Sequence, residues 1–150
     1  MKASQTINNL KPKTYLSIIT LFITFLFITS CSKKDDSNNC IEHTISECNE
    51  DSTKVNIRIT NISDNVFCNV VLIDMNCGII EQNQSSCYRA FESGYNYSFI
   101  ELEIDGNTYT IQPIDFVGET PLENGYYTYQ INTNDSNQQY EKLTLTFVED

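Results

Sequence analysis

The sequence feature that most constrains the fold is a two-residue alternation of apolar and polar side chains after position 54. In the segment VNIRIT, residues 55–60, every second side chain is aliphatic and the intervening residues are Asn, Arg and Thr. Such alternation places one face of a β-strand in a core and the other in water. Comparable patterns predict strands at residues 66–73, 85–91, 95–104, 126–133 and 141–148. No helical periodicity follows residue 31, so we expect an all-β domain.

The segment EIDGNTYTI gives the clearest prediction of strand pairing. Asp105 and Gly106 make a preferred two-residue hairpin turn, because both residue types tolerate a positive φ. This turn sets Leu102 opposite Tyr109 on one face of the hairpin. Together with the other patterns, the hairpin brings the expected total to about seven strands.

The segment PLENGYYTYQI supports a seven-stranded antiparallel β-sandwich of the immunoglobulin or fibronectin III type over residues 54–150. Leu122, Gly125, Tyr127 and Ile131 resemble the tyrosine corner of fibronectin-type domains. The resemblance implies that the Tyr127 hydroxyl bonds back to the backbone at the turn into a late strand.

A segment of a different kind precedes this domain. Residues 1–30 contain Lys2, Lys11 and Lys13 but no acidic side chain, and residues 15–29 are almost entirely apolar or small. A basic start followed by a short apolar run predicts a secretory signal peptide that is cleaved. A spanning helix needs about 20 apolar residues, which exceeds this run, although an uncleaved anchor remains the alternative.

The end of this segment, ITSC, resembles the bacterial lipobox, in which an aliphatic and two small residues precede an obligatory cysteine. The resemblance implies cleavage before Cys31, a diacylglycerol thioether on its thiol and an acyl chain on the new amine. No other cofactor is expected. Two or three acyl chains hold a protein stably in a bilayer. The alternative is an ordinary signal peptide with an incidental cysteine.

The residues after this cysteine, Lys33, Lys34, Asp35 and Asp36, resemble the surface-export signal of Bacteroidota lipoproteins. The resemblance implies an outer-membrane protein that faces outward; the alternative is the hydrated start of a tether. Residues 31–53 are polar and predict the lipidated cysteine and a tether. The segment IQPIDFVGETPLENGYYTY is similar to small flavobacterial-type lipoproteins, which implies location and fold but no activity.

The charge of the chain restricts its partners. The whole chain has 9 basic and 20 acidic residues, a formal net charge of −11. Six of the basic and all 20 of the acidic residues follow position 30, so the exported part carries about −14. Such a field repels nucleic acid and anionic lipid. We therefore expect contact with a bilayer only through Cys31, no nucleic acid, and an unknown protein or glycan partner.

Five further cysteines lie in the exported part, where disulfides can form. Closeness in sequence predicts one bridge between Cys40 and Cys48 and another between Cys77 and Cys87. Cys68 shares a strand face with aliphatic residues and is predicted to be a buried, unreactive thiol.

Three tyrosines are predicted to form a binding surface for a protein or sugar ring: Tyr95, Tyr97 and the out-of-phase Tyr126. The alternative is that they are ordinary strand-face residues. The tripeptide DST resembles the O-glycosylation motif of Bacteroidota, with a glycan on Ser52. His43 is the single histidine and lies in the predicted tether, so neither a metal site nor a histidine-dependent triad is predicted.

These features predict a lipid-anchored, non-catalytic binding or structural module with no catalytic residues. The rival hypothesis is a small exported enzyme or enzyme inhibitor whose site has no sequence signature. An enzyme requires a concave pocket with convergent polar groups, whereas a binding module requires an exposed aromatic face.

Overall fold

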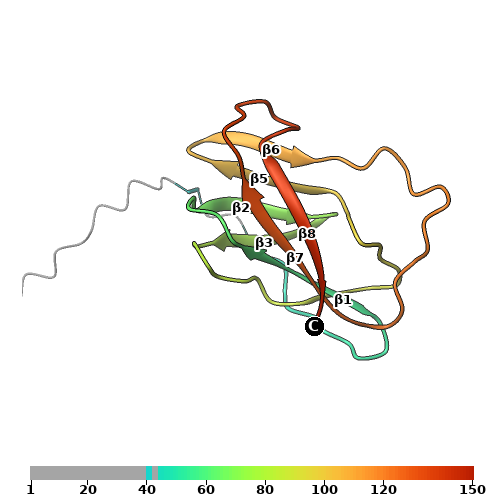
Figure 1. The fold of residues 1–150 in the computed structure, drawn as a ribbon. Helices are drawn as coiled ribbons and strands as arrows, with labels where there is room; N and C mark the ends of the chain where they lie inside the picture. The colour runs from blue at the N-terminus through green and yellow to red at the C-terminus, as the bar shows by residue number, and fades with distance from the viewer. Residues whose placement is uncertain (1–39, 42–43) are drawn as a thin grey trace, which may run out of the picture. The chain divides into compact units, whose positions relative to one another are not determined.

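The computed structural model describes residues 40–41 and 44–150, and this part of the chain forms eight β-strands and no helix (Figure 1). The strands are β1 Val55–Asn61, β2 Phe67–Leu72, β3 Met75–Ile80, β4 Arg89–Phe91, β5 Ile100–Ile104, β6 Asn107–Ile111, β7 Gly125–Thr133 and β8 Leu143–Glu149. The all-β prediction is confirmed, and the described residues contain one strand more than the expected seven.

The eight strands form two four-stranded sheets, in the orders β4-β1-β7-β8 and β3-β2-β5-β6. All neighbouring strands are antiparallel except β1 and β7, which run parallel. Both sheets contribute alternate side chains to one shared core, and its fully buried members include Ile57, Ile59, Phe67, Val70, Leu72, Ile100, Leu102, Tyr129 and Ile131. One face of each sheet is therefore covered by the other sheet, as the period-two pattern requires.

The predicted β5–β6 hairpin is confirmed. Leu102 pairs with Tyr109 as expected, and the turn consists of Asp105 and Gly106. Their φ angles are +51° and +75°, so both turn residues adopt the left-handed conformation that this residue pair favours.

β3 is the strand that the sequence did not predict. It follows β2 through a two-residue turn, Ile73 and Asp74, which closes the pair between Leu72 and Met75. Ile73 has a φ of +61°, a conformation that β-branched residues rarely adopt. Asp74 is a common turn residue, but Ile73 is not, and the turn contains no Gly, Asn or Pro to mark it in the sequence.

β2 is irregular. The register with both neighbouring strands shifts between Phe67 and Val71, where Asn69 has a φ of +48°. A bulge at this point lets Phe67 and Val70, three positions apart, both enter the shared core, which a regular two-residue period would not allow.

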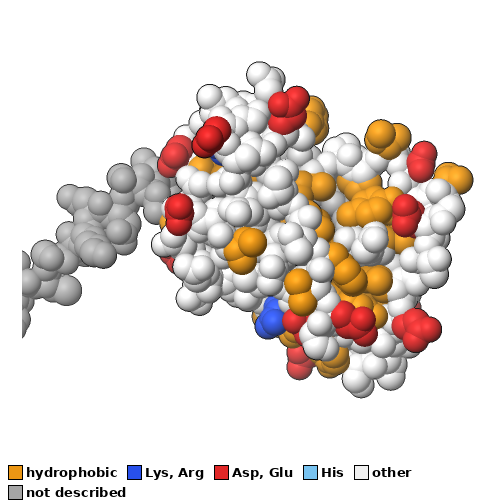
Figure 2. Space-filling view, in the orientation of Figure 1, with side chains coloured by type: hydrophobic (Ala, Val, Ile, Leu, Met, Phe, Trp, Pro, Cys, Tyr) orange, Lys and Arg blue, Asp and Glu red, His pale blue; other side chains and the backbone are white. Residues whose placement is uncertain are grey.

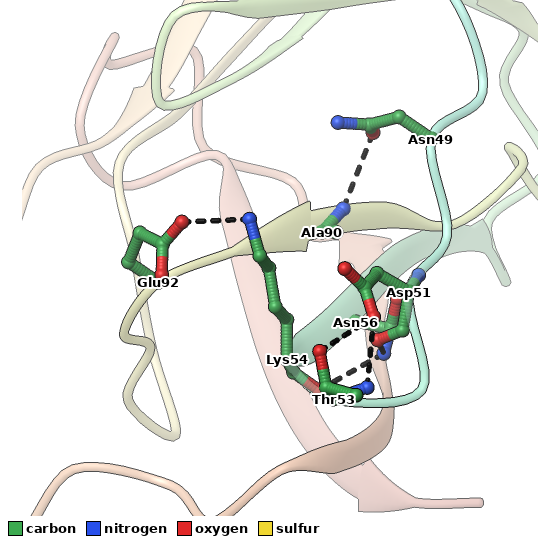
Figure 3. Close-up of polar contacts among 7 residues, drawn as sticks. All are labelled: Asn49, Asp51, Thr53, Lys54, Asn56, Ala90 and Glu92. Atoms are coloured by element: carbon green, nitrogen blue, oxygen red, sulfur yellow. Dashed lines mark hydrogen bonds and ion pairs between the residues drawn. The ribbon is translucent and has the colours of Figure 1, made fainter.

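Residues 44–54, called the strap below, are attached to both sheets. The Ser46 N–H donates to the Asn76 carbonyl of β3 over 2.9 Å, and the Asn76 N–H donates back to Ser46 Oγ over 3.0 Å. On the other sheet, the Ala90 N–H of β4 donates to Asn49 Oδ1 over 3.2 Å (Figure 3). The free tether predicted to reach residue 53 therefore ends earlier, because the strap is part of the folded domain.

The strap ends in a turn built around Asn56, a fully buried residue of β1. Asn56 Oδ1 accepts the Asp51 N–H over 2.8 Å, and Asn56 Nδ2 donates to the Asp51 carbonyl over 2.7 Å (Figure 3). The hydroxyl and N–H of Thr53 both donate to the Asp51 carboxylate, which lowers the pKa of Asp51. Beside this turn, Lys54 and Glu92 form an exposed ion pair of 2.6 Å.

The predicted disulfide pairing was wrong. The bridges are Cys40–Cys68 and Cys48–Cys87, with Cα–Cα distances of 5.3 and 5.8 Å. Among the described cysteines, Cys77 is the one with a free thiol, whereas Cys68, predicted to be free, is bonded. Both bridges join the region before β1 to the two-sheet domain, so they fasten this region to its sheets.

The error has a tertiary cause. Cys77 lies on β3 and Cys87 lies two residues before β4, and these two strands belong to different sheets. The chain between them therefore crosses from one sheet to the other, and closeness in sequence does not bring these two cysteines together. Cys77 is buried in the shared core; burial raises the pKa of its thiol, an effect partly opposed by the nearby charge of Arg89.

Candidate binding site

The tyrosine corner predicted at the entry to β7 is confirmed. The Tyr127 hydroxyl donates to the backbone carbonyl of Glu123 over 3.0 Å. The adjacent Leu122 N–H donates to the Gly94 carbonyl over 2.8 Å. These bonds fix the chain entering β7 and join it to the loop between β4 and β5.

A second tyrosine of β7 holds the same loop. The fully buried Tyr129 donates its hydroxyl to the Tyr95 carbonyl over 2.6 Å. Burial raises the pKa of Tyr129 far above its ordinary value, so the phenol remains a neutral donor. The loop that contains two of the predicted surface tyrosines is thereby anchored to the core.

A cavity of ≈ 280 Å³ lies beside this anchored loop. Its wall is mainly aliphatic and aromatic, with two serines and one glutamine as its polar members; the lining residues are Ile57, Ile73, Ser93, Gly94, Tyr95, Ser98, Phe99, Gln112, Pro113, Phe116 and Tyr129. At Gly94 a Cβ would lie 2.9 Å from Val55 Cγ1, so the close approach of the loop to β1 requires glycine.

Phe116 joins the loop after β6 to the two tyrosines of the preceding loop. Its ring stacks on Tyr95 at a centroid distance of 4.4 Å and on Tyr97 at 5.3 Å. The Tyr97 hydroxyl also donates to the Asp115 carbonyl over 3.2 Å. Tyr95 and Tyr97 therefore lie together as predicted, but their rings are half-buried and stacked against Phe116, not fully open to solvent.

Apolar side chains extend from this cluster into solvent. Ile114 and Val117 are 99% and 88% exposed, and Ile73 is 41% exposed at the cavity wall. Figure 2 shows hydrophobic side chains gathered on the side of the view where the loop after β6 lies, with acidic side chains among them. Exposed apolar groups concentrated in one region favour an interaction surface. We call the cavity and this rim the aromatic end.

Ile73 contributes backbone strain to the aromatic end. A β-branched residue in the left-handed region costs about 1–3 kcal/mol, so another residue type at this turn would make the fold more stable. The Ile73 N–H donates to the Phe99 carbonyl over 3.0 Å, which holds the strained turn against β5. Strain of this kind is concentrated at binding and catalytic sites.

Asp115 and Glu119 lie near the Tyr97 ring, and within residues 44–150 neither carboxylate forms an ion pair. Burial raises the pKa of Tyr97, and the carboxylates of Glu119 and Asp115 raise it further. The four basic residues of segment 44–150 have other partners or are buried: Lys54 pairs with Glu92, which precedes the cavity residue Ser93, Arg58 pairs with Asp150, Arg89 is buried, and Lys142 lies 6.0 Å from the Tyr109 ring centroid. The aromatic end therefore has a negative rim.

Tyr126 lies in a different cluster from the other predicted surface tyrosines. Its ring meets Tyr88 edge-on at 5.0 Å, and the Arg58 guanidinium lies 4.8 Å from the Tyr88 ring centroid. Asp150 accepts the Tyr88 hydroxyl over 2.8 Å and the Thr128 hydroxyl over 2.6 Å. Tyr126 belongs to this cluster, in which the polar groups bond to one another. The three predicted tyrosines therefore do not form one surface.

The Asp150 cluster gives a pH-dependent prediction. Partial burial by itself would raise the pKa of Asp150, but hydrogen bonds from Thr128 and Tyr88 and the charge of Arg58 lower it overall. Because the unfolded-state pKa is about 3.9, the carboxylate stabilises the fold above that pH. This stabilisation is lost as the pH falls through the lower folded-state pKa.

Asp150→Asn is therefore expected to lower the denaturation midpoint at neutral pH and to have little effect near pH ~2. Urea titration at both pH values measures this. Asp135→Asn, in an exposed loop, is the control for a simple change of net charge. An equal deficit of Asp150→Asn at both pH values would contradict the assigned role of the carboxylate.

The remaining predicted sites have different outcomes. Ser52 is exposed in the turn at the end of the strap, where a glycan has room. The predicted lipidation, export-signal and lone-histidine residues lie outside the described residues; they are Cys31, Lys33, Lys34, Asp35, Asp36 and His43. Within residues 40–41 and 44–150, no helix is long and apolar enough to cross a membrane.

No protein-family model and no curated protein sequence matches this chain. The candidate site therefore depends on its own geometry. Sequence reasoning identified Tyr95 and Tyr97 but missed Ile73 and Phe116. The available signal was the spacing of apolar residues in IQPIDFV, where Ile114, Phe116 and Val117 follow a proline outside any strand pattern.

Proposed function

We propose that this protein is a lipid-anchored, outward-facing outer-membrane module that binds a partner without catalysis, through its aromatic end. The observation that carries the binding role is the cavity bordered by exposed apolar side chains. Among the described residues, the titratable ones that line it are Tyr95 and Tyr129, and no described residue contributes a carboxylate, histidine, lysine or cysteine to the wall. Such a wall suits apolar contact better than general acid–base chemistry.

The domain type proposed is a β-sandwich related in architecture to immunoglobulin and fibronectin III domains. Two layers with one core and the Tyr127 corner support this proposal. The strand orders β4-β1-β7-β8 and β3-β2-β5-β6 differ from the immunoglobulin constant type, which pairs strands A, B, E and D opposite C, F and G. The proposed relationship therefore concerns layering and corner geometry, and does not extend to strand order.

The anchor is proposed at Cys31, and its position after an apolar run supports it. Cys31→Ser is expected to move the protein from the membrane fraction to the soluble fraction, or to leave an unprocessed precursor. Fractionation followed by intact-mass measurement checks this, because the wild-type chain should carry the mass of the acyl groups. A Cys31→Ser chain that is processed and still partitions fully with membranes would contradict the anchor.

The binding role is tested by photo-cross-linking on intact cells. A photoreactive amino acid replaces Ile114, which is 99% exposed at the aromatic end. The matched control replaces Thr108, an exposed residue near the opposite end of β6. Capture of a defined partner from position 114 and not from position 108 supports the proposal. Equal capture at both positions, or turnover of a captured small molecule by the purified protein, overturns it.

A further inference from the structure

We propose that the aromatic end binds a basic peptide segment of a partner protein. One bulky apolar side chain of the peptide enters the cavity, and flanking Lys or Arg residues face the carboxylates of Asp115 and Glu119. The inference rests on the proposed binding function and specifies the class of partner.

The size and lining of the cavity favour a single apolar side chain. At ≈ 280 Å³ the cavity lies just below the roughly 300–1,000 Å³ typical of sites for whole small ligands. An oligosaccharide presents many hydroxyls, whereas the polar groups of the described wall are few: Ser93, Ser98, Gln112 and the tyrosine hydroxyls, of which that of Tyr129 is already bonded. An unpartnered buried hydroxyl costs about 1–3 kcal/mol, so a glycan would bind this wall poorly.

The aromatic stacking also disfavours a sugar as the ligand. Sugars stack on open ring faces, but Phe116 already stacks on Tyr95 and Tyr97 with interplanar angles of 15° and 18°. Each stacking contact covers one face of each ring. Tyr95 and Tyr97 therefore offer a sugar at most one ring face each, while the stack supports the loop after β6.

Charge complementarity identifies the rest of the ligand. Residues 44–150 contain four basic and 17 acidic side chains, and the four basic ones are buried or engaged in the contacts described above. The exposed residues Asp115 and Glu119 lie on the loop that contains Phe116. A basic peptide gains from this field in both encounter rate and affinity, whereas an acidic one is repelled.

Strain at Ile73 provides an independent reason to assign binding to this cavity. An Asn at this position would adopt the observed φ of +61° more readily than a β-branched residue does. Ile instead places a half-exposed aliphatic side chain at the cavity wall. A contact retained at the expense of stability is expected at a functional surface.

The test measures binding of defined peptides to the full lipidated chain in detergent micelles by fluorescence anisotropy. The probe contains Lys-Phe-Lys between Gly-Ser flanks, and the comparison peptides contain Lys-Gly-Lys and Glu-Phe-Glu. We expect the Lys-Phe-Lys peptide to bind at least about tenfold more tightly than either comparison peptide. Its affinity should fall as the salt concentration rises.

Two variants test the location of the site without placing the fold at risk. Ile73→Asn should weaken the Lys-Phe-Lys peptide about tenfold while leaving the melting temperature unchanged or higher. The double variant Asp115→Asn with Glu119→Gln should weaken binding and flatten its salt dependence. Asp105→Asn with Asp135→Asn removes the same charge at exposed turns elsewhere and should preserve affinity.

Three results would overturn the inference. One is equal binding of all three peptides, and another is an equal loss in the control double variant. The third is tighter binding of a neutral hexasaccharide that Ile73→Asn abolishes, which would reassign the ligand and leave the binding function intact. Failure of the binding function itself would appear separately, as equal cross-linking from positions 114 and 108 on cells.

Discussion

Replacing Cys48 and Cys87 together by alanine is expected to lower the free energy of unfolding by about 4 kcal/mol. The bridge joins residues 39 positions apart, and its removal restores the entropy of that loop to the unfolded chain. The native state also loses the attachment of the strap to the residues before β4. Denaturant titration under non-reducing conditions measures the change, with the slope of the transition reporting unfolded-state compactness.

The control is Cys77→Ala, which removes the buried free thiol and leaves both bridges. We expect a loss of about 1 kcal/mol from the small volume removed. The Cys40–Cys68 bridge spans 28 positions, so its removal should cost slightly less than that of Cys48–Cys87. If Cys77→Ala destabilised the domain as much as loss of the 48–87 bridge, the pairing described above would be contradicted.

Arg89→Ala is expected to lower the free energy of unfolding by about 3 kcal/mol. Arg89 is fully buried at the start of β4, and its Nη2 donates to the Ser46 carbonyl of the strap over 2.5 Å. Nη1 contacts Cys87 Sγ and the Tyr88 carbonyl. The Arg89 side chain therefore fills the space beneath the strap and bonds the strap to the sheet that contains β4.

The same guanidinium also has an energetic cost. Within the described part of the chain no carboxylate pairs with Arg89, and its Nε has no hydrogen-bond partner. Burying a charge without a counterion is unfavourable, and apolar replacements of similar volume are often tolerated. Arg89→Met should therefore lose only about 1 kcal/mol, because it keeps the volume and removes the desolvation cost.

Comparing the two Arg89 variants by urea denaturation separates packing from hydrogen bonding. Equal losses in Arg89→Met and Arg89→Ala would show that the bonds to the strap matter more than the filled volume. Because Arg89 contacts Cys87, its effect and the disulfide effect are not expected to add. The disulfide measurement should therefore be made with Arg89 unchanged.

Features with local physical causes were predictable from the sequence. Asp105 and Gly106 determine the β5–β6 turn because both accept a positive φ, and this turn fixes the register of the hairpin. Tyr127 reaches a carbonyl four positions upstream, so the tyrosine corner also depends on neighbouring residues. The closeness of Tyr95 and Tyr97 was predictable for the same reason, because both belong to one short loop.

Features that depend on how the two sheets meet were not predictable. Phe116 is distant in sequence from Tyr95, and only the packed fold brings their rings to 4.4 Å. Tyr126 was grouped with Tyr95 and Tyr97 because the alternation in its strand predicted an exposed side chain. In the structure, the sheet that contains β4 and β7 places Tyr126 beside Tyr88. Ile73 gave no turn signal because tertiary contacts impose a backbone conformation that its side chain disfavours.

By itself, the sequence determined the strand character, the β5–β6 hairpin, the tyrosine corner and the acidic charge of this protein. These follow from the alternation of side chains, from turn residues and from ionisable groups, each of which acts over a few residues. Only the tertiary structure decided the disulfide partners, the attachment of the strap to both sheets and the cavity at the aromatic end. These require residues tens of positions apart to meet, and that meeting depends on the order of strands in two sheets, which local patterns do not specify.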